Sequence, residues 1–165
     1  MKLPSLNPLG IKRSSKGFTL IELLVVIAII SVLAVVVFVA LNPSQRLKDA
    51  KDARRTADVD TILTAIHAYI VDNKGALPTG LTTGMAEKQL GTAVAGAAIS
   101  TGGCAVVATA ALDMSTPLVK YLKAMPIDPE GTAALTRYSA EVDSNNIVTI
   151  RACGVEGTVN ISASR

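Results

Sequence analysis

An apolar run of 24 residues, from Phe18 to Leu41, constrains this chain more than any other feature. As an α-helix it would extend about 36 Å, at about 1.5 Å per residue, and the hydrocarbon core of a bilayer is about 30 Å thick. The run is therefore long enough to cross a membrane. Its one charged residue is Glu22, close to its start.

Glu22 needs a partner. A carboxylate inside such a span costs about 2.5–3.5 kcal/mol on insertion scales, so an intramembrane acid indicates function by default. No Lys, Arg or His lies within the span to pair with it. Cleavage between Gly17 and Phe18 would create an α-amino group on Phe18, one helical turn from Glu22. We expect this amine, on the same or a neighbouring chain, to be the partner.

The start of the run also carries a motif. Its residues are Lys16-Gly17-Phe18-Thr19-Leu20-Ile21-Glu22, and they resemble the prepilin peptidase recognition site of type IV pilins and of type II secretion pseudopilins. The resemblance implies that the leader is removed after Gly17, that Phe18 is N-methylated, and that Glu22 guides docking into a helical filament. It also implies prepilin peptidase, an assembly ATPase, a platform protein, the membrane and further copies of this chain as partners.

The charge balance agrees with a removable leader. The chain has 16 Lys and Arg against 13 Asp and Glu. The first 17 residues hold four of these cations and no acid, so their removal leaves 12 cations against 13 acids. The basic excess therefore belongs to the leader, which argues against a nucleic-acid-binding body.

Charge alone does not orient the span, because cations also follow it closely. The resemblance places the leader in the cytoplasm and the head outside. It implies a single-pass protein of the bacterial cytoplasmic membrane that enters a surface or periplasmic filament. Two other interpretations stay open. The run could belong to a secretory signal peptide, although it is longer than the usual 7–15 residues, or to a single-span anchor that is never processed.

The sequence divides the chain into four parts. Asn42-Pro43 should interrupt the helix, because proline lacks an N–H and clashes with the preceding turn. Beyond it, apolar residues at spacings of three and four predict an amphipathic helix that ends near Gly75. The predicted parts are a leader at 1–17, a membrane and filament-core helix at 18–41, an amphipathic helix at 42–74 and a head at 75–165.

The head should contain a small antiparallel sheet. Apolar and polar residues alternate in three stretches, 136–142, 148–153 and 159–164, and predict three strands with one apolar face for the helix stripe. Short helices are expected near 85–90 and 116–122, and 75–112 reads as a long Gly/Ala/Thr-rich loop. The predicted fold class is α+β, with a long N-terminal helix packed on the sheet, and is similar to the pilin fold.

The two cysteines, Cys104 and Cys153, predict a disulfide if the head lies outside the cytoplasm; two free thiols are the alternative. Two cysteines and the single His67 cannot complete a zinc shell, so we expect no metal or cofactor. Some pseudopilins bind calcium, and two turns offer oxygen ligands, but without EF-hand spacing. These candidate ligands are Asp128, Glu130, Asp143, Asn145 and Asn146.

Two function classes remain. The sequence has no convincing nucleophile, base and acid arrangement, and no Gly-rich phosphate loop, so we expect no enzymatic activity. The leading hypothesis is a structural subunit of a type IV pilus or of a type II secretion or competence pseudopilus. The alternative is a membrane-tethered binding module that never polymerises. Glu22 discriminates between them, because a monomeric tether has no use for a carboxylate in its span.

Overall fold

The computed structural model describes residues 17–165 except 108, 109 and 158, and separates into two compact units, Met1–Asn42 and Pro43–Arg165. Helix α1 (Leu20–Leu41) makes up most of the described part of the first unit. Its end coincides with Asn42, whose left-handed backbone (φ 40°) cannot continue a right-handed helix. Helix α2 (Pro43–Asp72) then opens the second unit, with proline at its first position, where the missing N–H leaves no bond unmade.

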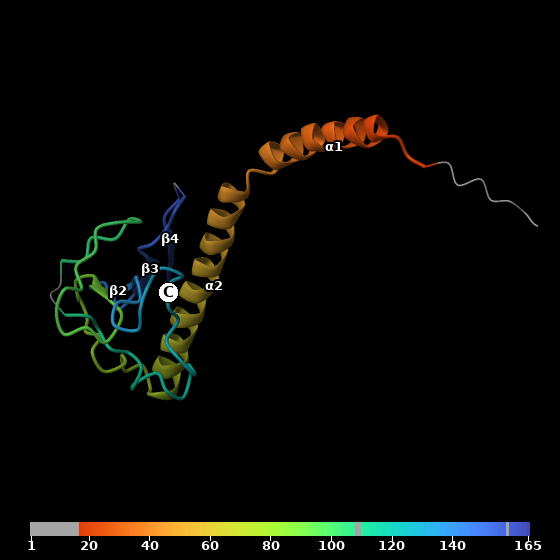
Figure 1. Cartoon of the computed structure of the whole chain (residues 1–165). Helices are drawn as coiled ribbons and strands as arrows, with labels where there is room; N and C mark the ends of the chain where they lie inside the picture. Colours follow the sequence, from red (N-terminus) through yellow and green to blue (C-terminus); the bar gives the residue numbers. More distant parts are fainter. Residues whose placement is uncertain (1–16, 108–109, 158) are drawn as a thin grey trace, which may run out of the picture. The chain divides into compact units, whose positions relative to one another are not determined.

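The second unit has an α+β fold, which confirms the predicted class (Figure 1). Its strands are β1 (Lys88–Gln89), β2 (Tyr138–Val142), β3 (Val148–Ala152) and β4 (Ile161–Ser164). They form one antiparallel sheet in the order β1-β2-β3-β4. Helix α2 packs against β3 and β4. A turn at 143–146 joins β2 to β3, and the register pairs Ala140 with Ile150.

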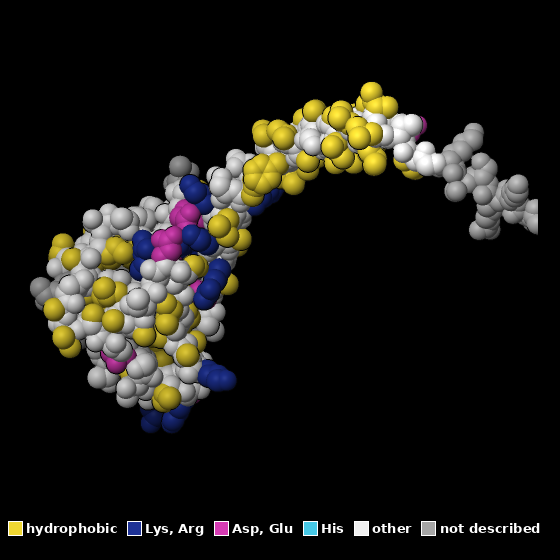
Figure 2. All heavy atoms as spheres, viewed as in Figure 1, with side chains coloured by type: hydrophobic (Ala, Val, Ile, Leu, Met, Phe, Trp, Pro, Cys, Tyr) yellow, Lys and Arg dark blue, Asp and Glu magenta, His cyan; other side chains and the backbone are white. Residues whose placement is uncertain are grey.

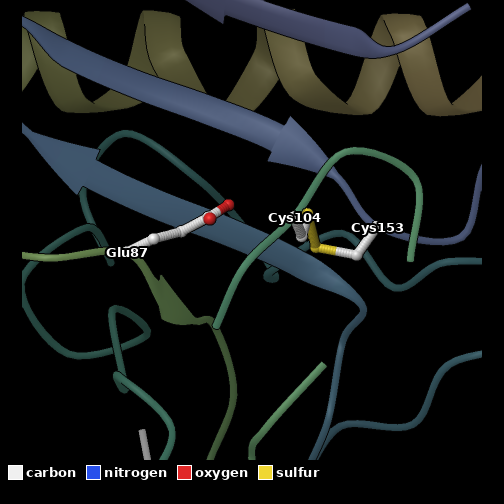
Figure 3. A group of neighbouring side chains, drawn as sticks. All are labelled: Glu87, Cys104 and Cys153. Carbon is white, nitrogen blue, oxygen red and sulfur yellow. A yellow bond between two sulfur atoms is a disulfide. The ribbon is translucent and has the colours of Figure 1, made fainter. Parts of the chain in front are cut away.

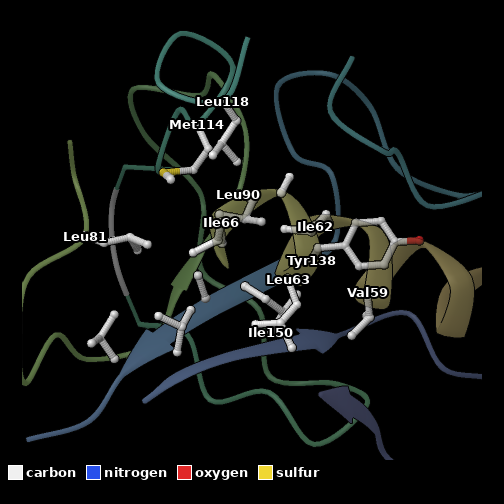
Figure 4. Close-up of a cluster of buried hydrophobic side chains, with 14 of the residues drawn as sticks. Val59, Ile62, Leu63, Ile66, Leu81, Leu90, Met114, Leu118, Tyr138 and Ile150 are labelled. Carbon is white, nitrogen blue, oxygen red and sulfur yellow. The ribbon is translucent and has the colours of Figure 1, made fainter. Parts of the chain in front are cut away.

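The core lies between α2 and the sheet (Figure 4). The predicted stripe of α2 is buried through Val59, Ile62, Leu63 and Ile66. The alternating apolar residues of β2 and β3 face this stripe, since side chains on a strand point alternately to its two faces. The sheet contributes Tyr138, Ala140, Val142, Val148, Ile150 and Ala152 to this core. Connecting segments close it with Leu81, Leu90, Met114 and Leu118.

Three local expectations were wrong. The segment 85–90 is not helical but contains β1, because its backbone bonds to β2: Leu90 N–H donates to Tyr138 O at 2.7 Å, and Val142 N–H donates to Met85 O at 3.2 Å. The sheet therefore has four strands instead of three. Segment 116–122 forms consecutive turns and no α-helix. The last strand begins at Ile161, so Val159 is not a core residue and is 73% exposed.

Candidate processing and assembly site

The first turn of α1 is closed by two residues of the motif. Thr19 is the N-cap, and its backbone N–H and its hydroxyl each donate to Glu22 Oε2 at 2.8 Å. In return, Glu22 N–H donates to Thr19 Oγ1 at 3.3 Å. This reciprocal arrangement is a capping box, which satisfies helix N–H groups that have no partner in the preceding turn. In this state the carboxylate of Glu22 is held by its own helix end.

The predicted cleavage position lies just outside this helix. Gly17, Phe18 and Thr19 have no regular secondary structure, and a side chain at Gly17 would meet no described atom within 4 Å. Phe18 is 81% exposed. The Gly17–Phe18 peptide bond is therefore free of helical hydrogen bonding and open within its own unit. Residues 1–16, which include the basic part of the predicted leader, lie outside the described residues.

Helix α1 is apolar around its whole circumference, and none of its residues is buried by the described residues of its own unit. Figure 2 shows hydrophobic side chains along the visible face of this helix. Ser31, a polar residue in its middle, donates its hydroxyl to Ile27 O at 2.7 Å and so needs no outside partner. A helix that is hydrophobic all round belongs inside a membrane or an assembly. Its length and composition are sufficient to cross a membrane.

The comparison with protein families decides what this end of the chain is. Residues 12–38 match the prokaryotic N-terminal methylation motif. The chain carries the type IV pilin and pseudopilin signature. The motif supports a pilin-like substrate of prepilin peptidase, and the apolar helix α1 supports membrane anchoring through the N-terminal part of the chain. Comparisons with curated proteins and with solved structures gave no match.

In the head of this pilin-like chain, Cys104 and Cys153 form a disulfide with a Cα–Cα distance of 5.5 Å. It ties a hairpin-like loop, in which Ile99 and Val106 exchange backbone hydrogen bonds, to the end of β3. Glu87 lies beside the two sulfur atoms (Figure 3). These three residues resemble a metal-ligand set, but the sulfur atoms are bonded to each other and offer no thiolate.

The head also contains a buried ion pair that the sequence analysis missed. Arg55 and Asp128 are fully buried side chains, and Arg55 Nε donates to Asp128 Oδ2 at 2.5 Å while Nη2 donates to Oδ1 at 3.1 Å. Arg55 Nη1 also donates to Asp52 Oδ1 at 2.8 Å. A signal was present: Arg55 precedes Val59 and Ile62 by four and seven residues, so it lies in line with the apolar stripe.

The pair shifts the pKa values of its members. The hydrogen bonds that Arg55 donates to Asp128 are the main reason that the pKa of Arg55 is raised, although burial acts in the opposite direction. Burial has the largest single effect on Asp128 and acts to raise its pKa. The hydrogen bonds from Arg55 and from Glu130 N–H, together with the charge of Arg55, outweigh that effect, so the pKa of Asp128 is lowered.

A wider charge cluster surrounds this pair. Lys51 Nζ contacts Glu156 at 2.7 Å and Glu130 at 2.9 Å, and Glu130 also pairs with Arg137 at 2.9 Å. Figure 2 shows mixed acidic and basic side chains gathered on part of the head surface. The cluster joins α2 to the turns at 128–130 and 154–157.

Three of the candidate calcium ligands, Asp128, Glu130 and Asp143, already have partners. Asp128 and Glu130 pair with cations as described, and Gly154 packs so closely on Asp128 that a Cβ there would lie 2.7 Å from its Oδ2. Asp143 Oδ1 accepts hydrogen bonds from the N–H groups of Asn145 and Ile147, which shape the β2–β3 turn. Among the described residues, these oxygens serve ion pairs and a turn.

Proposed function

We propose that this chain is a structural subunit of a filament, of the type IV pilus or of the type II secretion or competence pseudopilus kind. The observation that carries the proposal is the methylation motif at the start of a helix whose side chains find no cover among the described residues of its own unit. Such a helix must be covered by lipid before assembly, and further copies of α1 can replace the lipid in a filament.

Processing precedes docking in this proposal. The leader is cut between Gly17 and Phe18, and the new amine of Phe18 is methylated. Before cleavage no amine is available on Phe18. The capping box suggests that the Glu22 carboxylate then accepts hydrogen bonds from Thr19 instead. After cleavage, the ammonium of a neighbouring Phe18 pairs with Glu22. When two subunits are in register, the amine of one neutralises the Glu22 charge of the other, which is costly in an apolar environment. Docking is therefore favourable only in the correct register.

The remaining parts keep the roles expected from the sequence. We assign residues 1–17 to the leader, 18–41 to the membrane and filament core, 42–74 to the helical support of the head and 75–165 to the rest of the head. The head lies outside the cytoplasm, in an oxidising compartment in which the disulfide is stable. Prepilin peptidase, a platform protein and an assembly ATPase are the proposed partners, and the subunit itself has a structural role without catalysis.

The test compares Glu22→Ala with Ser31→Ala, which removes another polar group of α1. Glu22→Ala makes the span more apolar, so membrane insertion and cleavage persist, while the yield of sheared filaments falls below detection. Ser31→Ala leaves filament yield unchanged, because Ser31 bonds only within its own helix. Subunit level is followed by immunoblot of membranes. Normal filament yield in Glu22→Ala would remove Glu22 from the mechanism and favour the membrane-tethered binding module.

A further inference from the structure

A carboxylate stands beside the disulfide of the head. A carboxylate oxygen of Glu87 and the two sulfur atoms of Cys104 and Cys153 all lie within 4.8 Å of one another. Figure 3 shows the Glu87 side chain directed toward the disulfide. The site is largely closed to solvent, because Cys104 is 5% exposed, Cys153 is 0% exposed and the Glu87 side chain is 9% exposed.

The position of this carboxylate is fixed by three donors. Ser139 Oγ donates to Oε1 at 2.5 Å, Ala105 N–H donates to Oε2 at 2.8 Å, and an Arg151 nitrogen lies 3.5 Å from Oε1. All three partners present hydrogens, which suits an ionised carboxylate that only accepts. Arg151 does not cancel the charge, since its shorter contact, at 2.6 Å, is to Glu141. Two carboxylates thus share one guanidinium.

We propose that Glu87 protects the disulfide from thiol reductants by electrostatic repulsion. Reduction by dithiothreitol begins when its thiolate attacks one sulfur, for example that of Cys104. A mixed disulfide then forms, and Cys153 leaves as a thiolate that takes a proton from solvent. The second thiol of the reagent loses its proton, closes the six-membered ring and expels Cys104 as a thiolate, which is protonated in turn. The reagent is oxidised, and the two cysteines are reduced.

Each of these steps brings negative charge next to Glu87. The attacking thiolate must leave water to reach a nearly closed site, and charge interactions are stronger there than in bulk solvent. The leaving thiolate forms in the same place. A carboxylate within 4.8 Å of both sulfur atoms therefore opposes attack on either one. The consequence is that the loop around Cys104 stays tied to β3 when the chain meets thiols.

The test is the rate of reduction of the full-length chain in detergent micelles, read by maleimide labelling of the released thiols. Glu87→Gln keeps an oxygen acceptor at the site but removes the charge, and should speed reduction by dithiothreitol about tenfold. Glu141→Gln tests the sharing of Arg151: it leaves this guanidinium with Glu87, which partly cancels the carboxylate charge beside the sulfurs, so it should speed reduction by less than Glu87→Gln does.

A neutral reductant separates charge from loosening of the loop. Tris(hydroxypropyl)phosphine brings no negative charge, so Glu87→Gln should accelerate its reaction much less than that of dithiothreitol. Two results would overturn the proposal: equal dithiothreitol rates for the native chain and Glu87→Gln, or an equal acceleration with both reductants. The second result would mean that the substitution merely opens the loop. Neither readout depends on filament assembly.

Discussion

Arg55 and Asp128, which are 73 residues apart in the chain, form a two-point ion pair with both side chains fully buried. The guanidinium comes from the stripe of α2 that packs on the sheet, and the carboxylate comes from the turn that leads into β2. The pair therefore fastens α2 to the turn that precedes β2. Breaking such a pair is more costly than never having it, because the remaining charge stays buried.

We first predict that Asp128→Asn lowers the free energy of unfolding of the head by about 3 kcal/mol, since Arg55 then keeps, within the described part of the chain, only Asp52 and Glu156 as ionic partners. Urea unfolding of the full chain in detergent, followed by tyrosine fluorescence, measures the change. The matched control is Arg54→Ala, which removes the exposed pair of Arg54 with Asp58 at 3.6 Å and its hydrogen bond to Ile127 O at 3.3 Å, and should cost less than about 1 kcal/mol. Equal effects of the two variants would contradict the account.

The second prediction concerns acid. The pKa values of Asp128 and Asp52 are both lowered: for each, burial opposes the shift and the hydrogen bonds from Arg55 and backbone N–H groups outweigh it. A carboxyl group with a lowered folded-state pKa stabilises the fold above its unfolded pKa, about 3.9, and loses that contribution as pH falls through the folded value. The thermal midpoint of the native head should therefore drop below about pH 4.

Asp128→Asn supplies the check on this pH dependence. Because its amide does not titrate, the variant should show a shallower fall in thermal midpoint between about pH 4 and pH 2 than the native chain does. Asp52 still titrates, so some dependence remains. Parallel curves for the two proteins would show that the acid sensitivity comes from other groups.

Third, we predict that peptide mapping without reductant recovers Cys104 linked to Cys153. Cys153→Ser should lower the thermal midpoint by several degrees, because the bond closes a loop spanning 49 residues, worth about 4 kcal/mol in the chain-entropy model. Maleimide labelling of both cysteines in the untreated, unfolded chain would contradict the disulfide. An unchanged midpoint would mean that the bond adds little to stability.

Much of the head could be predicted from periodicity. The stripe Val59, Ile62, Leu63 and Ile66 and the alternation in β2 and β3 are regular over several residues, and each is confirmed by burial. Strand β1 has only two residues, which is too short to show an alternation of apolar and polar residues. It exists because its backbone completes the edge of β2, which depends on tertiary contact.

The ion pair of Arg55 with Asp128 also could not be predicted from the sequence, because it depends on tertiary contact. In the sequence, Arg55 is one of several cations after the span and Asp128 one of several acids in turns, and nothing local links them. The position of Arg55 in line with the apolar stripe indicates that it could be buried, but only the fold shows that Asp128 is its partner. The capping box differs, because Thr19 and Glu22 are three residues apart and form a recognisable helix start.

Fourth, we predict that processing depends on the small residue at Gly17. In cells that contain prepilin peptidase, Gly17→Leu should leave the precursor uncut in the membrane, because its side chain crowds the position before the scissile bond. Gly17→Ala is the milder comparison and should be cut slowly. Intact-mass measurement of the purified protein distinguishes these outcomes. Efficient cleavage of Gly17→Leu before Phe18 would contradict the assignment of Gly17.

The central claim is that the processed chain builds a filament. Its most direct test is electron microscopy of filaments sheared from cells that express the chain with its assembly machinery, combined with the intact mass of the filament subunit. The account predicts filaments whose subunit begins at Phe18 and carries one N-terminal methyl group. Recovery of the chain solely in the membrane, with the mass of the full precursor or of a chain cut within α1, would contradict it.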